Sequence, residues 1–108
     1  MIIPDDQVQE ALDFIEGNAV AAAQATANRK HLEDFTKSLK ALLMQERVLD
    51  PLGAQERYAL AHPKMLEHLE AKKQAVFEDE RQQNMLNAKH TKLDVWRSLS
   101  ARERAGLI

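Results

Sequence analysis

The chain has 108 residues, a formal net charge of -2, 30% charged residues, 5% aromatic residues and no cysteine. Its length suits one domain, and a composition dominated by Ala, Leu, Glu, Lys, Arg and Gln is typical of long helices and coiled coils. The charge balance marks no global preference for nucleic acid, and the lack of cysteine excludes disulfides and thiolate zinc sites.

The start of the chain does not resemble a secretory signal peptide. Asp5 and Asp6 stand where such a peptide carries basic residues, and no apolar run approaches the length of a membrane span. We therefore expect a cytoplasmic protein with no membrane contact.

Residues 6–16 are predicted to form a short amphipathic helix. Apolar residues recur at helical intervals from Val8 to Ile15, and Asp6 with Gln9 has the spacing of a capping box. Gly17-Asn18 is typical of a helix end or hinge. The charged residues of this segment are all acidic: Asp5, Asp6, Glu10, Asp13 and Glu16.

A long helix is predicted over residues 18–47. Its candidate inner face has spacings that alternate between four and three, close to the period of a coiled-coil seam. The residues of this face are Ala21, Ala25, Asn28, Leu32, Phe35, Leu39, Leu42, Glu46 and Leu49.

Asp50-Pro51-Leu52-Gly53 is the clearest break in the chain, and a short helix is predicted after it over residues 54–61. A second long helix is predicted over residues 63–99, because Pro63 suits a first helical turn and the segment contains no glycine. Such a helix would be roughly 55 Å long. The connection is short, so we expect the two long helices to be antiparallel neighbours.

The second long helix has two apolar ends and a polar middle, residues 78–84. We expect this middle to be exposed or to line a wet seam within a continuous helix, with a kink as the alternative. Ser100 and Glu103 form a second capping-box pattern, so a short C-terminal helix is predicted over residues 101–106.

These patterns predict an all-α protein, with residues 1–108 in one helical domain built on a long, coiled-coil-like antiparallel hairpin. A small core with few aromatics stabilises a lone monomer poorly, so we expect a homo-oligomer, with the hairpin closed within one chain or swapped between chains. The predicted core or oligomer seam contains Leu32, Phe35, Leu39, Leu42, Leu66, Leu69, Val76, Leu93 and Trp96.

No pattern in the sequence indicates catalysis. The four histidines, His31, His62, His68 and His90, lack the spacings of known zinc and di-iron motifs. No glycine-rich phosphate loop is present, and no serine has a nearby histidine and acid in the sequence. We expect no metal, no cofactor and no enzymatic activity.

Basic residues on both long helices are candidates for nucleic-acid binding. Near the C-terminus they surround Trp96, and a cationic groove with an aromatic platform is what sequence-tolerant binding of single strands requires. The competing interpretation is a solvated basic face, with Trp96 in the core or at a subunit interface. The candidate residues are Arg29, Lys37, Lys40, Arg47, Arg57, Lys89, Lys92 and Arg97.

Residues 54–105 resemble small helical proteins encoded by bacteriophages and prophages, and the resemblance rests on short motifs. These are Gln55-Glu56-Arg57, Ala61-His62-Pro63, Val95-Trp96-Arg97-Ser98 and Ala101-Arg102. More distantly, the order of a long helix, a short segment and a second long helix resembles UvsY-type recombination mediators of phages. That resemblance implies an oligomeric helical protein that binds single-stranded DNA and helps to load a recombinase.

The first functional hypothesis is therefore a phage accessory protein of DNA recombination or replication in the cytoplasm of a bacterial host. It would be a homo-oligomer that handles single-stranded DNA, with a recombinase or single-strand-binding protein as partner. The alternative is a helical adaptor or host-directed inhibitor that binds a protein through its acidic N-terminal helix and binds no nucleic acid. A third option is an assembly or packaging component of the virion, which would form larger oligomers.

Overall fold

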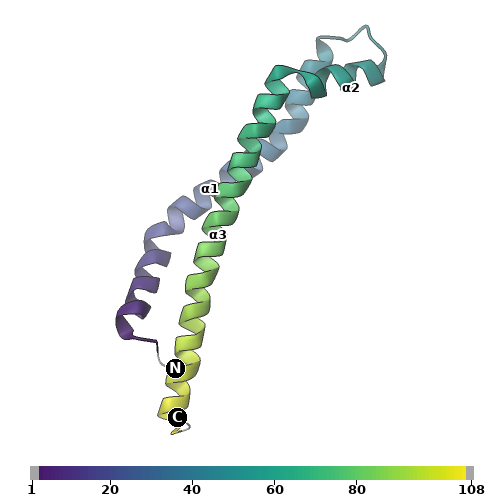
Figure 1. The fold of residues 1–108 in the computed structure, drawn as a ribbon. Helices are drawn as coiled ribbons and strands as arrows, with labels where there is room; N and C mark the ends of the chain where they lie inside the picture. Colours follow the sequence, from purple (N-terminus) through teal and green to yellow (C-terminus); the bar gives the residue numbers. More distant parts are fainter. Residues whose placement is uncertain (1–2, 107–108) are drawn as a thin grey trace. The chain divides into compact units, whose positions relative to one another are not determined.

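The computed structural model describes residues 3–106, which form three helices in this range (Figure 1). The first helix, α1, covers Asp5–Gln45, the second, α2, covers Leu52–Ala61, and the third, α3, covers Pro63–Arg104. The predicted all-α class and the two long helices are confirmed. Pro63 is the first residue of α3, and His62 before it is extended, with φ -67° and ψ 138°.

The expected break at Gly17-Asn18 is absent, since the predicted helices 6–16 and 18–47 are one helix that ends at Gln45. The side chain of Asn18 donates a hydrogen bond from Nδ2 to the carbonyl oxygen of Phe14, at 2.8 Å, and so follows the helix rather than ending it. An interior glycine costs a helix about 1 kcal/mol, and the buried Ala11 before Gly17 and Ala22 after it show that α1 is packed on both sides of this position.

The C-terminal segment also differs from the prediction, because residues 101–104 continue α3 and no separate helix starts at Ser100. Gly106 ends the helix instead. Its φ of +71° is in the left-handed region that favours glycine. Its backbone N–H donates to the carbonyl oxygen of Glu103 at 3.0 Å. At the other break, α2 begins two residues earlier than predicted, at Leu52.

The chain divides into two compact units. The terminal unit contains the residues up to Ala23 and those from Glu80 onward, and the hairpin unit contains Gln24–Asp79. In the terminal unit, Val8 and Ala11 of α1 are buried against Leu93 of α3, with Ile15 and Trp96 packed around them. Early residues of α1 thus meet late residues of α3, and the two helices are antiparallel there.

In the hairpin unit, the end of α1 packs against α2 and the start of α3 (Figure 1). Leu39 and Leu43 of α1, Ala59 of α2 and Met65 of α3 form its buried apolar cluster, and Met44 packs against this cluster. Because late residues of α1 meet early residues of α3, this unit is also an antiparallel helix pair.

The faces that meet in the hairpin unit are rotated by one residue from the predicted seam. On α1, Leu32 and Leu39 point inward as expected, but Leu42 is 55% exposed while the next residue, Leu43, is 3% exposed. On α3, Met65 and His68 are buried, and the predicted Leu66 and Leu69 beside them are exposed.

Of the predicted seam residues, Leu39 and Leu93 are buried, and Leu32, Val76 and Trp96 are half-buried. The remaining four lie outside the core of the single chain, and their place in an oligomer seam stays a prediction. They are Phe35, Leu42, Leu66 and Leu69.

The rotated seam predicts unequal effects for two neighbouring leucines. Leu43→Ala should lower the free energy of unfolding by about 2–5 kcal/mol, because it leaves a cavity in the apolar cluster. Leu42→Ala should cost well under 1 kcal/mol, because an exposed side chain leaves no cavity. Urea denaturation followed by circular dichroism, at a protein concentration where the chain is monomeric, measures both. Equal losses of unfolding free energy would contradict the observed orientation of α1, in which Leu43 is buried and Leu42 is exposed.

Candidate functional site

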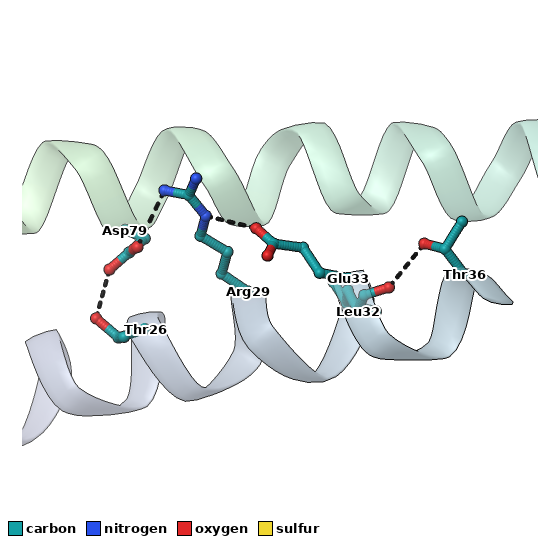
Figure 2. Close-up of polar contacts among 6 residues, drawn as sticks. All are labelled: Thr26, Arg29, Leu32, Glu33, Thr36 and Asp79. Carbon is teal, nitrogen blue, oxygen red and sulfur yellow. Dashed lines mark hydrogen bonds and ion pairs between the residues drawn. The ribbon is translucent and has the colours of Figure 1, made fainter. Parts of the chain in front are cut away.

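The most distinctive group of side chains in the hairpin unit is a polar layer between α1 and α3, made of Thr26, Arg29, Glu33 and Asp79 (Figure 2). Asp79 of α3 is only 7% exposed. Its carboxylate accepts hydrogen bonds from the hydroxyl of Thr26 and from Nη1 of Arg29, the latter at 3.3 Å. Arg29 also donates from Nε to Glu33 at 2.7 Å.

This polar layer explains how a carboxylate is accommodated inside a helix pair. Burying a charge is unfavourable unless hydrogen bonds and an opposite charge compensate for the lost water. The hydrogen bond to Glu33 and the carboxylate of Asp79 raise the pKa of Arg29 above its usual value. Of the two expectations for residues 78–84, exposure is therefore wrong at Asp79, which lies instead in a polar seam between the helices.

A second polar contact lies closer to α2. His68 of α3 is 8% exposed, and its Nε2 is 2.7 Å from the hydroxyl of Thr36. The single proton of that hydroxyl is donated to the carbonyl oxygen of Leu32, at 3.0 Å. With that proton used, the hydroxyl accepts from His68, which places a proton on Nε2 of the ring. Phe35 covers the ring edge-on, with centroids 5.6 Å apart.

Polar contacts also join α2 to the turn that follows α1. The hydroxyl of Tyr58 donates to Glu46 at 2.8 Å, and this hydrogen bond raises the pKa of Tyr58 above its usual value of 10. The guanidinium of Arg47 lies over the Tyr58 ring, 4.8 Å from its centroid. His62 lies edge-on to the same ring at 5.5 Å. These contacts hold Tyr58 of α2 against the turn that follows α1.

Half of the predicted nucleic-acid-binding residues have partners within the chain. Arg29 belongs to the polar layer, Arg47 covers Tyr58, Lys89 lies 5.5 Å from the centroid of the Phe14 ring, and Arg97 is 3.6 Å from Asp94. The other four are the exposed Lys37 and Arg57 and the half-buried Lys40 and Lys92.

The predicted cationic residues are also divided between the two units. Arg29, Lys37, Lys40, Arg47 and Arg57 belong to the hairpin unit, and Lys89, Lys92 and Arg97 belong to the terminal unit. In the sequence of the hairpin unit, nine Lys and Arg residues balance nine Asp and Glu residues, a net charge of zero. The hairpin unit as a whole therefore carries no excess of positive charge around its five candidates.

Exposed apolar side chains are the other notable feature of residues 3–106. Thirteen large apolar residues are exposed, including Val20, Phe77 and Val95, whereas five non-alanine apolar residues are buried. Single exposed leucines are ordinary, but rows of them on one helix face indicate a contact surface. Sequence reasoning placed Phe77 at an apolar end of its helix but not among the seam residues.

The polar layer itself was missed, although the sequence contains a signal for it. Ala22, Arg29, Thr36 and Leu43 recur every seventh residue, one position after the row Ala21, Asn28, Phe35 and Leu42 that apolarity favoured. A helix face that contains Arg and Thr is not expected to be buried on grounds of apolarity. Only the facing Asp79 and His68, which pair with these residues, make its burial favourable.

Comparisons with protein-family models, with curated proteins and with solved structures found no match. Within residues 3–106, no group of three or more acidic, histidine or cysteine side chains could hold a metal ion. None of the helices over the same residues is long and apolar enough to cross a membrane.

The polar layer gives a prediction about stability. Thr26→Val keeps the shape of the side chain and removes the donor to a buried carboxylate, so the free energy of unfolding should fall by about 1–3 kcal/mol. Thr91→Val is the matched control, since Thr91 is an exposed threonine on α3. Chemical denaturation of both variants measures the difference. Equal stabilities would mean that the hydrogen bond between Thr26 and Asp79 contributes nothing.

Proposed function

We propose that this chain is a helical accessory protein of phage DNA recombination or replication, which works as a homo-oligomer and handles single-stranded DNA or loads a recombination protein. The observation that carries the proposal is the exposure of large apolar side chains on both long helices, beside an intrachain seam that is partly polar. Such helices gain further apolar burial when a second subunit or a protein partner covers them.

The DNA part of the proposal depends on the cations that remain accessible. Lys37 of α1 and Arg57 of α2 are exposed side chains of the hairpin unit, and Lys40 lies three residues after Lys37 on the same helix. Sequence-independent binding of a single strand needs phosphate contacts of this kind rather than a shaped pocket. In an oligomer, repetition of the few cations of each subunit would supply the avidity that one chain lacks.

Fluorescence anisotropy with a labelled oligothymidine at two salt concentrations tests the DNA part. Affinity should fall as salt rises, with a slope of about 0.7 for each phosphate contact. Lys37→Ala and Arg57→Ala should each reduce that slope and weaken binding by a few fold. Lys64→Ala, an exposed cation outside the predicted set, is the control. No binding at low salt, or equal losses for all three variants, would contradict the proposal.

A second candidate is a protein-binding adaptor that uses the acidic start of α1. All five acidic residues at this end, from Asp5 to Glu16, have exposed side chains. The apolar residues Val8 and Ala11 of the same segment are buried in the terminal unit, so the acidic groups are displayed on a packed helix. A row of exposed carboxylates is complementary to a basic protein surface and steers association with it.

Replacing those five acids with Asn or Gln separates the two candidates, because the substitutions leave Val8 and Ala11 in place. If the chain handles DNA, the neutralised variant should bind oligothymidine as well as the original chain or better, since five repelling charges are gone. If the chain is an acidic adaptor, DNA binding is absent in both proteins. The adaptor should also bind an arginine-rich peptide in a salt-dependent way, and the neutralised variant should lose that binding.

A further inference from the structure

An exposed row of side chains on α3 runs through the hairpin unit, outside the seam with α1. We call it the α3 stripe, and at about 100° per residue its members fall within about 120° of the helix surface. Leu66 and Phe77 are 56% and 64% exposed, Leu69 is 39% exposed, and Val76 is half-buried. The stripe consists of Leu66, Leu69, Glu70, Lys73, Val76 and Phe77.

Along the edge of the stripe formed by Leu69 and Val76 lies an open hollow of about 300 Å³, lined by these two residues and by Lys72 and Lys73. These residues have the spacing i, i+3, i+4 and i+7. Four residues with this spacing form the hole that receives one side chain of a neighbouring helix in a coiled coil. An apolar residue from another helix would contact Leu69 and Val76 there, and the aliphatic parts of the two lysines.

The order of charges along the stripe determines which helix fits. Two apolar residues lie at each end, and Glu70 and Lys73 lie between them, one acidic and one basic. A second copy of α3 in the parallel direction would place Glu70 against Glu70 and Lys73 against Lys73. In the antiparallel direction, a two-fold axis near residue 71 places each Glu70 opposite the Lys73 of the other copy.

The same two-fold axis aligns the apolar residues. Leu66 of one copy comes opposite Val76 and Phe77 of the other, and Leu69 of one copy comes opposite the hollow of the other. Because of the two-fold symmetry, each of these contacts occurs twice. A surface that matches itself under a two-fold rotation is what an isologous dimer interface requires. We propose that the α3 stripe is the interface of an antiparallel homodimer, with Leu69 of each copy in the hollow of the other and reciprocal pairs between Glu70 and Lys73.

This inference specifies the homo-oligomer part of the proposed function and rests on that part, but it needs no DNA contact. The contact extends over about three helical turns, so it is a small interface, and we expect a dissociation constant on the order of micromolar. At such an affinity the dimer forms and separates with protein concentration, which makes it measurable by sedimentation equilibrium.

The test uses charge reversal in the full chain. Either single variant, Glu70→Lys or Lys73→Glu, places like charges opposite each other at both symmetry-related positions of the dimer. Each should therefore raise the dissociation constant of the dimer about tenfold. The double variant, with both changes in one chain, restores the opposite pairs and should dimerise like the original chain. Phe77→Asp should abolish the dimer. Lys64→Glu, outside the stripe, is the charge control, and circular dichroism checks that each variant stays helical.

Mixing the two single variants gives a sharper result, because Glu70→Lys offers two cations and Lys73→Glu offers two anions. The mixture should form a heterodimer at protein concentrations at which neither variant alone forms a homodimer. If the original chain is oligomeric but the reversals and Phe77→Asp leave its mass unchanged, the α3 stripe is not the interface and the homo-oligomer remains. If the original chain is a monomer at every concentration up to the millimolar range, the inference and the homo-oligomer part of the proposed function are both wrong.

Discussion

The hairpin unit depends on the accommodation of Asp79 between two helices. A carboxylate that is 7% exposed is tolerated there because Thr26 and Arg29 donate to it, and Arg29 is in turn held by Glu33. This requirement fixes which face of α1 meets α3. A rotation of α1 by one residue would bring Phe35 and Leu42 inward, but it would also turn the donors away from the buried charge.

The exposed apolar surface follows from this choice of faces. With arginine, threonine and histidine in the seam, the bulky residues beside them are displaced to the flanks of the helices. Phe35 and Leu42 of α1 and Leu66, Leu69 and Phe77 of α3 are consequently exposed in the single chain. A buried polar group that specifies one helix register, at some cost in stability, is an established use of such residues in coiled coils. In this protein the polar seam also leaves apolar side chains exposed on the flanks of the helices, where another subunit or protein can contact them.

Those stripes connect the fold to the proposed function. A helical accessory protein has no pocket chemistry to perform, so its activity lies in the surfaces that it presents and in how copies of it assemble. The α3 stripe is self-complementary, and the exposed cations Lys37 and Arg57 belong to the same unit. Assembly through α3 would therefore bring the cations of two copies into one particle.

The sequence by itself determined the helical class, the presence of a break around Asp50-Pro51 and the start of α3 at Pro63. These features depend on local properties: helix propensity, the fixed φ of proline and the conformational freedom of glycine. Local signals also misled, since Gly17-Asn18 and Ser100 look like helix boundaries but lie within helices whose packing outweighs a weak local preference. Only the tertiary structure decided which side of each helix is inside. Apolarity alone favoured the row with Phe35 and Leu42, and the row with Arg29 and Thr36 becomes favourable only because Asp79 and His68, more than thirty residues away, supply its hydrogen-bond partners.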